Sequence, residues 1–563
     1  MAALEKIRLL KDRSELAYFL GYTPQTLSYI LYKLPEDQKY NSFKIPKRNG
    51  HERIIQAPCK QLKQLQKKIS NIFYECLNEL QLKNNLASVS YGFKKNNSIL
   101  DNAKKHKNKR WVFNIDLEDF FQSINFGRVR GFFLKDKNFL LSPEVATVIA
   151  QIVCHDNGLP QGSPSSPIIS ELITRILDQR LLVLAKTNKV TYTRYADDIT
   201  FSTNLKKFPP DIAIDLSDYH LDWKIGDKLI EEIKICGFNI NNSKTRMHYK
   251  NSRQLVNGLI VNKKVNIKSE YYKLTRAMCY SLFKSGKVIF SDKKNIDSNK
   301  RLHGILNFIY KTKNFNDNRD IYEKREVQSS IRLLFKNYLY YKYCIANDKV
   351  IIFTEGKTDV IYIKYALRFL KNTTSTILPK LFSKEIQLYS HSKYNNEIMD
   401  LYDGGVGGLK RFILYYFNNI IDKDKNLFEY EEDIKPVIII VDNDNESRQI
   451  KSLLKSKCPS FATNRDNYFH IGKNLYIVFI TSEKFEEPYI EQLFPDNILK
   501  TTHEGKIFNP TNRPCRPNEY GKEVFAKHVI LKNKDQNIFG GFIGLFKDIQ
   551  SCLYDFENSF KKK

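Results

Sequence analysis

The sequence has no cysteine pair at the CxxC spacing that zinc sites and redox motifs use. Its nine cysteines are scattered over 563 residues, which favours reduced, structural thiols over a disulfide framework. No apolar run approaches the length of a membrane span, and the opening stretch MAALEKIRLLKDRSELAYFLGYTPQ lacks the apolar core and cleavage site of a leader. Internal repeats are also absent. These absences argue against a zinc module, a secreted disulfide scaffold and a membrane protein, and they predict a cytoplasmic protein.

Acidic residues are scarce relative to basic ones. The chain has 62 Asp and Glu against 91 Lys and Arg, which gives a net charge of +29. So large an excess of positive charge attracts a polyanion, and nucleic acid is the partner it favours. The hydrophobic content of 42% excludes a disordered basic tail. The length is sufficient for more than one domain.

The first 80 residues are predicted to be mostly helical. Two short helices are expected on either side of Gly21, the second beginning after Thr23 and Pro24, a pair typical of a helix N-terminus. They could form a DNA-reading helix-turn-helix, although a packing appendage is favoured. The stretch FKIPKRNGHERIIQAP predicts a hairpin that turns at Arg48-Asn49-Gly50. A lysine-rich helix, KQLKQLQKKISNIFYECLNEL, follows.

Strands and helices alternate from Trp111 to about Asn262, and the pattern then changes. Residues 284–326 are polar and weakly patterned around one short apolar helix, so we place a domain boundary between residues 330 and 346. Beyond it, KVIIFTEGKTDVIYIKYAL predicts a strand, a turn and a helix, and KPVIIIVDNDNE predicts a second buried strand. Because these strands are continuous apolar runs, they are typical of a parallel α/β sheet.

Two adjacent carboxylates interrupt a predicted strand in TYTRYADDITFS. Asp197 and Asp198 repel each other by about 4 kcal/mol at an effective dielectric near 20. A solvated turn is one explanation. A divalent cation is the other, because Mg²⁺ prefers carboxylate and phosphate oxygens. The second explanation requires a further acid, and Asp116 ends the apolar strand in RWVFNIDLEDFF. The stretch NGLPQGSPSSPIISELI, between the two strands, predicts a turn into a helix N-terminus suited to phosphate or base contacts.

This combination resembles the palm of reverse transcriptases. The [YF]xDD box of that family falls on residues 195–198, its first aspartate on Asp116 and its LPQG element on residues 159–162. The resemblance implies that Asp116 and Asp197 hold two Mg²⁺ ions, assisted by Asp198. Such a pair activates the primer hydroxyl and stabilises the leaving pyrophosphate.

The same resemblance assigns the nucleotide contacts. Phe121 would be the bulky gate that excludes a ribose 2′-OH, and Gln161 would contact the incoming nucleotide. Arg53 and Lys244 would meet its triphosphate, with Arg48 as the competitor of Arg53.

Two short boxes resemble those of retron reverse transcriptases. NAKKH matches their NAxxH signature, and VNG stands where they carry VTG, with asparagine in place of threonine. The resemblance implies contacts with the enzyme's own structured RNA and a thumb, VNIKSEYYKLTRAMCYSL, that lies on the duplex. The predicted RNA-binding residues are Asn102, His106, Val256, Asn257 and Gly258.

A second acidic constellation lies beyond residue 350. FTEGKTDV sets Glu355 after a strand, with Gly356 and Asp359 on the turn into a helix, and a glycine-rich turn, DGGVGGLKRF, follows. Asp442 and Asp444 lie two apart at another strand end, so strand alternation would place them on one side. Surface acids in a loop are the competing interpretation.

This set resembles a Toprim domain, the fold of topoisomerases, primases and OLD-type nucleases. The resemblance makes Glu355 the general acid/base or a metal-bridging residue, and Asp442 and Asp444 the ligands of one or two Mg²⁺ ions. PYIEQLFP resembles a further acidic element of OLD-type nucleases and adds Glu491 as a ligand. Lys522 and Lys527 are candidates to stabilise charge on a phosphate. A nuclease is favoured over a topoisomerase or a primase.

The sequence therefore predicts a multidomain α/β and α+β protein: a right-hand reverse transcriptase followed by a Toprim α/β domain with a parallel-type sheet. The predicted parts are a helical appendage (1–40), fingers and palm (41–262), thumb and polar connector (263–330), Toprim domain (346–500) and its C-terminal extension (501–563).

The function predicted is a retron RNA-directed DNA polymerase that makes branched, RNA-linked single-stranded DNA, fused to a nuclease effector in antiphage defence. Its partners would be a structured non-coding RNA, the DNA product, deoxynucleoside triphosphates and a nucleic-acid target of the nuclease. No membrane partner is expected, and a homo-oligomer is possible. The alternatives are a reverse transcriptase with a non-catalytic Toprim binding module, and a mobile-element polymerase.

Overall fold

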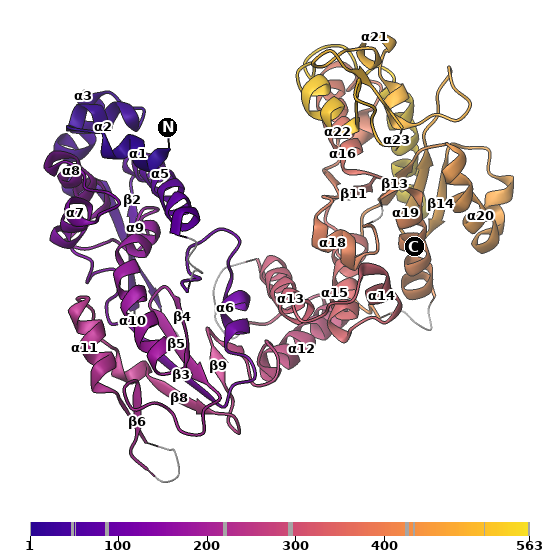
Figure 1. Ribbon diagram of the computed structural model, residues 1–563. Helices are drawn as coiled ribbons and strands as arrows, with labels where there is room; N and C mark the ends of the chain where they lie inside the picture. Colours follow the sequence, from indigo (N-terminus) through magenta and orange to yellow (C-terminus); the bar gives the residue numbers. More distant parts are fainter. Residues whose placement is uncertain are drawn as a thin grey trace. The chain divides into compact units, whose positions relative to one another are not determined.

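The chain folds into two compact units, Met1–Lys268 and Ser269–Lys563, which are drawn from indigo to magenta and from pink to yellow in Figure 1. The computed structural model describes residues 2–560 except 47–49, 51, 85–88, 218–221, 291–296, 403, 423–426, 432–433 and 512. Within these residues, no helix combines the length and the apolar character needed to cross a membrane.

The first unit contains mostly short strands among longer helices. Its strands are β1 (Tyr40–Pro46), β2 (Glu52–Pro58), β3 (Trp111–Asp116), β4 (Thr191–Tyr195), β5 (Asp198–Thr203), β6 (Ala213–Asp215), β7 (Trp223–Ile225), β8 (Arg246–Tyr249), β9 (Leu255–Val256) and β10 (Leu259–Ile260). Its helices are α1 (Ala3–Arg8), α2 (Arg13–Phe19), α3 (Pro24–Ser28), η1 (Tyr29–Lys33), α4 (Glu36–Lys39), α5 (Lys60–Asn84), α6 (Ile99–Lys105), α7 (Phe126–Lys135), α8 (Pro143–Val153), α9 (Ser166–Ile173), α10 (Arg175–Thr187), α11 (Asp227–Ile235) and η2 (Asn242–Lys244).

A four-stranded antiparallel sheet in the order β4-β5-β3-β8 is the centre of this unit. Helices α6 and α10 pack on β4, and apolar side chains from the sheet and helices form one continuous core. The predicted hairpin is present as β1 and β2, although Arg48 and Asn49 of its turn lie outside the described residues. This arrangement places the end of β3 beside the start of β5, where the predicted acids lie.

The N-terminal helices belong to the packing of the first unit. Thr23 caps α3 by accepting a hydrogen bond from the Thr26 N–H, and Pro24 occupies the first helical turn, as the sequence predicts. Helix α1 packs on α5 and α2 packs on α8, and Ile7 and Leu16 are fully buried. These are the contacts expected if the N-terminal helices form a packing appendage.

The second unit contains a helical layer and an α/β sheet. Its strands are β11 (Val350–Phe353), β12 (Ile386–Leu388), β13 (Val437–Val441), β14 (Tyr468–Gly472), β15 (Leu475–Phe479), β16 (Ile507–Phe508) and β17 (Glu519–Tyr520). Its helices are α12 (Ser269–Ser285), α13 (Ser298–Asn314), α14 (Ile321–Glu326), α15 (Ser330–Tyr340), η3 (Tyr341–Ile345), α16 (Lys357–Thr373), α17 (Pro379–Phe382), α18 (Lys393–Ile398), α19 (Gly405–Tyr416), η4 (Phe417–Ile421), η5 (Asn445–Ser447), α20 (Arg448–Lys457), η6 (Pro459–Thr463), η7 (Ile490–Leu493), α21 (Asp496–Leu499), α22 (Lys522–Val524), η8 (Phe525–Ile530) and α23 (Phe542–Phe560).

The sheet of the second unit has the order β12-β11-β13-β15-β14. Strands β12, β11, β13 and β15 are parallel, and β14 is an antiparallel edge. Every residue of β11, β13 and β15 is buried, which explains the continuous apolar runs in the sequence. Ligands of open α/β sheets bind beyond the carboxyl ends of such strands.

The helices before the sheet pack together with it. Helices α12, α13 and α15 contact one another, and α15 contacts α18. The compact units therefore divide at residues 268 and 269, whereas residues 330–345 form the continuous helical segment α15–η3. The finer division into thumb, connector and Toprim domain stays a prediction.

Candidate active sites

The acidic box of the first unit lies on a tight hairpin turn. Tyr195 and Asp198 are the last paired residues of β4 and β5, and Ala196 has a φ of 56°, the left-handed geometry that two-residue hairpins favour. A Cβ on Gly92 would lie 2.7 Å from the Ala196 backbone nitrogen, so only glycine permits this approach. The turn places Asp197 at the tip of the hairpin.

Strand pairing brings the third acid to the same end of the sheet. Asp116, the last residue of β3, lies opposite Asp198 of β5. Burial and then the charge of Asp116 raise the pKa of Asp197. Asp198 keeps contact with solvent, yet the surrounding protein, followed by Asp197 and Asp116, raises its pKa to about 6. The repulsion expected from the sequence is therefore present in the fold.

Lys244 forms an ion pair with Asp116, one of these three carboxylates. The Lys244 Nζ donates to Asp116 Oδ1 and Oδ2 at 2.9 and 2.8 Å. Lys244 reaches this position because the Asn241 N–H donates to the Asp116 carbonyl at 2.8 Å, which fixes the start of η2. Its ammonium partly offsets the negative charge that a divalent cation would neutralise.

These three carboxylates suit Mg²⁺ in chemistry, since they supply hard oxygen donors and their mutual repulsion favours a cation. Within the described part of the chain, no group of three or more His, Cys, Asp and Glu residues already has the arrangement of a metal site. The donor set fits the ion, and the Lys244 contact with Asp116 is the interaction that an ion would replace.

A cleft of about 810 Å³ opens beside the acids. It brings together six residues that the sequence assigns to metal or nucleotide binding, while Asp198 is not in its lining. The six are Arg53, Asp116, Phe121, Gln161, Asp197 and Lys244.

The LPQG loop forms one wall of this cleft by docking on β2. The Gln56 N–H donates to the Gln161 carbonyl at 2.7 Å. Gly162 has a φ of +128°, and a Cβ there would lie 2.8 Å from the Gln56 carbonyl oxygen. The loop can approach the strand this closely only with glycine, which explains the Gln-Gly pair.

Two adjacent phenylalanines differ in their surroundings. Phe120 is 4% exposed and stacks on Phe238 with 5.8 Å between ring centroids. Phe121 is half-buried, and its ring centroid lies 6.1 Å from that of Phe93, another residue of the cleft. Both residues border the cleft, but the greater exposure of Phe121 suits a gate, and the burial of Phe120 suits a core residue.

We expect Phe121→Ala to admit ribonucleotides, because it removes bulk from the cleft without touching a carboxylate. Discrimination against ribonucleotides should fall about tenfold or more, measured as the ratio of kcat/KM for matched deoxy- and ribonucleotides. Phe120→Ala is the control and should cost about 3–5 kcal/mol of stability without changing that ratio. Relaxed selection in the control alone would contradict the assignment of the gate.

The residues of the two short boxes point mostly into the protein. Asn102, His106 and Val256 are 1%, 0% and 1% exposed, so direct RNA contact by their side chains does not agree with this structure. Asn257 is half-buried and Gly258 is exposed, which leaves these two accessible to RNA. The sequence pattern located the boxes and did not indicate that Asn102 and His106 of the first box are buried, although Lys104 and Lys105 between them are exposed.

His106 holds the acidic hairpin from the core side. Its Nδ1 and Nε2 lie 2.7 Å from Ser202 Oγ and Thr193 Oγ1, which belong to β5 and β4. Burial lowers the pKa of His106 to about 3. A neutral imidazole therefore joins the two strands that carry the turn.

Two asparagines of the boxes, Asn102 and Asn257, are linked to Asp198 by hydrogen bonds. Asn257, with a φ of 47°, donates from Nδ2 to Asp198 Oδ2 at 3.1 Å. Asn102 Nδ2 donates to Asn257 Oδ1. These hydrogen bonds link the NAxxH box through the VNG box to Asp198, and they make Asn102 and Asn257 positioning residues.

We expect Asn257→Ala to lower kcat about tenfold, because a hydrogen bond to a charged group contributes roughly 1.5–3 kcal/mol. Since the Asn257 hydrogen bond lowers the pKa of Asp198, its loss should also shift the acid limb of the pH–rate profile to higher pH. Asn257→Thr, which restores a donor, should recover both. A loss of activity with an unshifted pH profile would contradict the positioning role.

A buried ionic network, which was not predicted from the sequence, lies behind the turn. Arg194 of β4 is 1% exposed and donates to Asp178 at 2.7 and 2.8 Å and to Glu171 at 3.0 Å. Its Nη1 also donates to the Ala196 carbonyl at 3.1 Å. A charged residue inside a short strand was the available signal, and Arg194 fixes the turn that carries Asp197.

The second unit places its acids at the carboxyl edge of the parallel sheet. Glu355 follows β11 and Asp442 follows β13, which are neighbouring strands. The Asp442 N–H donates to Glu355 Oε1, and the Ile490 N–H donates to Asp442 Oδ1, both at 2.9 Å. The glycine-rich turn also reaches this edge, since the Gly405 N–H donates to the Glu355 carbonyl at 3.2 Å. Asp403, which opens that stretch, lies outside the described residues.

The acids at this edge are half-buried or buried. Burial, followed by the charges of neighbouring acids, raises the pKa of Glu355 to about 8 and that of Asp442 well above its usual value. Glu491 is fully buried, and burial raises its pKa to about 7 despite the Lys522 ammonium 3.2 Å away. Asp359 accepts from the Gly356 N–H at 2.9 Å. The edge holds an acid cluster with one lysine in it.

Asp444 and Lys527 are placed differently from the expectation. Strand β13 ends at Val441, so strand alternation does not govern Asp442 and Asp444. Asp444 Oδ1 instead accepts from the Glu446 and Ser447 N–H groups and caps η5. Lys527 pairs with Glu523 at 2.6 Å on the surface. The four predicted ligands, Glu355, Asp442, Asp444 and Glu491, supply oxygen donors of the kind that Mg²⁺ prefers. The Lys522 ammonium already lies beside Glu491, at a position where a metal cation would otherwise neutralise this carboxylate.

The comparisons with known proteins concern the first half of the chain. Residues 45–268 match the family model described as reverse transcriptase (RNA-dependent DNA polymerase). The retron Ec86 reverse transcriptase of Escherichia coli is 34% identical over 263 residues, which cover 46% of this chain and 74% of that protein. The chain belongs to the retron reverse transcriptases. It is accordingly an RNA-directed DNA polymerase.

A second relative agrees with that membership. The retron Mx162 reverse transcriptase of Myxococcus xanthus is 34% identical over 277 residues, which cover 45% of this chain and 54% of that protein. A solved structure of telomerase from Candida albicans aligns with a TM-score of 0.30 and 11% identity, over 54% of this chain and 60% of that chain; so slight a likeness adds nothing to the assignment. The family match of this retron reverse transcriptase ends at residue 268, where its first compact unit also ends.

Proposed function

We propose that this retron reverse transcriptase copies a structured non-coding RNA partner into single-stranded DNA that stays joined to the RNA through a 2′-OH. The observation that carries the proposal is the single cleft that gathers Asp116, Asp197, Phe121 and Gln161. Because the NAxxH and VNG boxes are hydrogen-bonded to the acidic hairpin, RNA bound at Gly258 or Asn257 would lie next to the synthesis site.

The chain's own residues would divide the work in the cleft. Asp116 and Asp197 would hold Mg²⁺, which when bound activates the primer hydroxyl and stabilises the leaving pyrophosphate. Asp198, oriented by Asn257, would assist them. Lys244 would leave the Asp116 carboxylate and, with Arg53, meet the triphosphate, since both cations line the cleft. Phe121 would select deoxynucleotides.

The second unit is proposed to be a Toprim-type, Mg²⁺-dependent nuclease effector. The supporting observation is the direct hydrogen bond between the Asp442 backbone and Glu355 at the carboxyl edge of a parallel sheet. Glu355 would move a proton or bridge metal, Asp442 would be a ligand, and Asp444 and Glu491 would join it if their present partners are released. The raised pKa of Glu355, caused mainly by burial, suits a group that takes up and releases a proton.

These two activities together suit antiphage defence in the cytoplasm. The RNA–DNA product would restrain the effector until infection disturbs the complex, because an unrestrained nuclease would damage its own cell. The partners proposed are the non-coding RNA, its DNA product, deoxynucleoside triphosphates and the nucleic acid that the effector attacks.

Sequencing the nucleic acid that copurifies with the protein tests the proposal. One discrete RNA joined covalently to DNA, resistant to separation by denaturation and released by a debranching enzyme, is the expected result. The matched preparation is the Asp197→Asn protein, which should carry the RNA without attached DNA. Recovery of many unrelated templates in place of one RNA would favour a mobile-element polymerase.

A further inference from the structure

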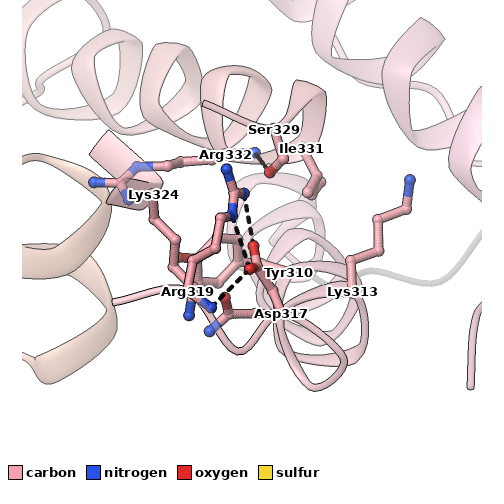
Figure 2. Close-up of a pocket in the computed structure, with 9 residues that line it drawn as sticks. Tyr310, Lys313, Asp317, Arg319, Lys324, Ser329, Ile331 and Arg332 are labelled. Carbon is pink, nitrogen blue, oxygen red and sulfur yellow. Dashed lines mark hydrogen bonds and ion pairs between the residues drawn. The ribbon is translucent and has the colours of Figure 1, made fainter. Parts of the chain in front are cut away.

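A small pocket in the helical layer of the second unit is lined largely by basic residues (Figure 2). Its volume is about 50 Å³. One water needs about 10–15 Å³ of such space, so the pocket has room for about three to five waters or one tetrahedral anion, and none for a base. The residues that line it are Tyr310, Lys313, Asn314, Asp317, Arg319, Lys324, Ser329, Ile331 and Arg332.

The guanidinium of Arg332 is the buried charge in this lining. Arg332 of α15 is 1% exposed, and its Nη2 donates to the Glu397 carbonyl and to Asp400 Oδ1, both at 2.7 Å. Its Nε and Nη1 are buried and have no hydrogen-bond partner among the described residues. Unpaired buried donors on a charged group are costly, so their presence calls for a bound water or ion.

The rest of the pocket adds positive charge. Asp317 is its only lining carboxylate within the described chain, and Arg319 holds it through hydrogen bonds of 2.9 and 2.8 Å (Figure 2). Lys324 of α14 brings another ammonium group to the lining, whereas the Lys313 Nζ lies over the Tyr272 ring, 3.9 Å from its centroid. Asp400 is shared, since the Lys336 Nζ lies 2.6 Å from its Oδ2. Arg319, Lys324, Arg332 and Lys336 are thus four cations against the two carboxylates Asp317 and Asp400.

We propose that this pocket binds a phosphate monoester group. The Nε and Nη1 groups of Arg332, which have no partner among the described residues, can each donate a charge-assisted hydrogen bond to a phosphate oxygen. Ser329 Oγ accepts from the Arg332 N–H, so its hydroxyl proton is available to an oxygen. The surplus of cations suits a dianion, and the small volume suits a terminal phosphate that enters end-on. The source would be a strand end, a nucleotide or inorganic phosphate.

The test uses the full-length protein in EDTA, so that nucleotides are not held by metal in either acidic site. Thermal stability is followed during titration with inorganic phosphate. Binding is then compared for one oligonucleotide carrying a 5′-phosphate or a 5′-hydroxyl. The variants are Arg332→Gln and, in case that buried change prevents folding, Lys324→Gln at the half-buried rim. Lys311→Gln is the control, because Lys311 is exposed on α13 and does not line the pocket.

The wild type and the Lys311→Gln control should be stabilised by phosphate, with an affinity about tenfold or more above that of Lys324→Gln. A preference for the 5′-phosphorylated strand that is lost in Lys324→Gln identifies a strand end as the source. A phosphate response without that preference identifies free phosphate or a nucleotide. Equal phosphate responses in the wild type, Arg332→Gln and Lys324→Gln would overturn the proposal.

Discussion

Asp197→Asn is expected to abolish DNA synthesis by this retron reverse transcriptase. Metal-ion catalysis contributes several kcal/mol to the transition state, so the loss of one ligand should lower the rate by at least about a thousandfold. The reason is local, since Asp197 occupies the tip of the hairpin and lines the cleft beside Asp116. Primer extension on a defined RNA template, at saturating Mg²⁺ and deoxynucleotide, measures the effect.

The fold should survive this substitution. Burial and Asp116 raise the pKa of Asp197, so replacing the carboxylate by an amide removes an unfavourable charge, and thermal stability should not fall. Asp119→Asn is the matched control, because Asp119 is an exposed carboxylate of the same cleft with no proposed contact to metal. Normal synthesis by Asp197→Asn, or equal losses in both variants, would show that the palm has been assigned to the wrong residues.

The polymerase site could be predicted from sequence because its parts are local. The Asp-Asp pair, the preceding strand and the turn-forming Leu-Pro-Gln-Gly element are each contiguous. The antiparallel pairing of β3 with β5 then places Asp198 opposite Asp116. Six of the predicted metal and nucleotide residues line one cleft, and Asp198 lies outside its lining. Their individual roles stay predictions.

Contacts between distant residues could not be predicted in this way. The hydrogen bonds that join Asn102 to Asn257 and Asn257 to Asp198 span 155 and 59 residues. The hydrophobic periodicity of a sequence does not indicate which side chains two distant segments will bring together. A motif match shows that a pattern recurs, but not whether its side chains point into the protein or toward solvent. For that reason His106 and Asn102 were predicted to contact RNA and are instead buried.

The second unit shows the same contrast between local features that the sequence predicts and contacts that it does not. Continuous apolar runs predicted the buried parallel strands β11 and β13, and the acids that follow them reach one edge. The spacing of Asp442 and Asp444 was interpreted by strand alternation, which requires a continuing strand. Because β13 ends at Val441 and η5 begins three residues after Asp442, the backbone N–H groups of η5 capture Asp444 instead.

Glu355→Ala and Asp442→Ala are expected to remove phage protection while leaving DNA synthesis intact. Both acids belong to the second compact unit, and the polymerase cleft lies entirely in the first. Loss of a ligand or proton-transfer group should lower nuclease activity by orders of magnitude, so plaquing should rise to the level of cells without the system. Asp197→Asn, which blocks synthesis of the proposed restraining complex, should remove protection as well, and it should slow the growth of uninfected cells because the effector then lacks its restraint.

The experiment expresses each variant with the partner RNA and measures the RNA-linked DNA and plaquing separately. Glu483→Gln is the control, because Glu483 is an exposed acid outside the cluster, and it should preserve both readouts. The two proposed activities are separable only if synthesis persists when Asp442 is lost. Full protection by the Asp442→Ala protein would exclude a catalytic effector and favour a second unit that only binds, because the Lys522–Glu491 ion pair and the Asp444 cap would then hold the site closed to metal.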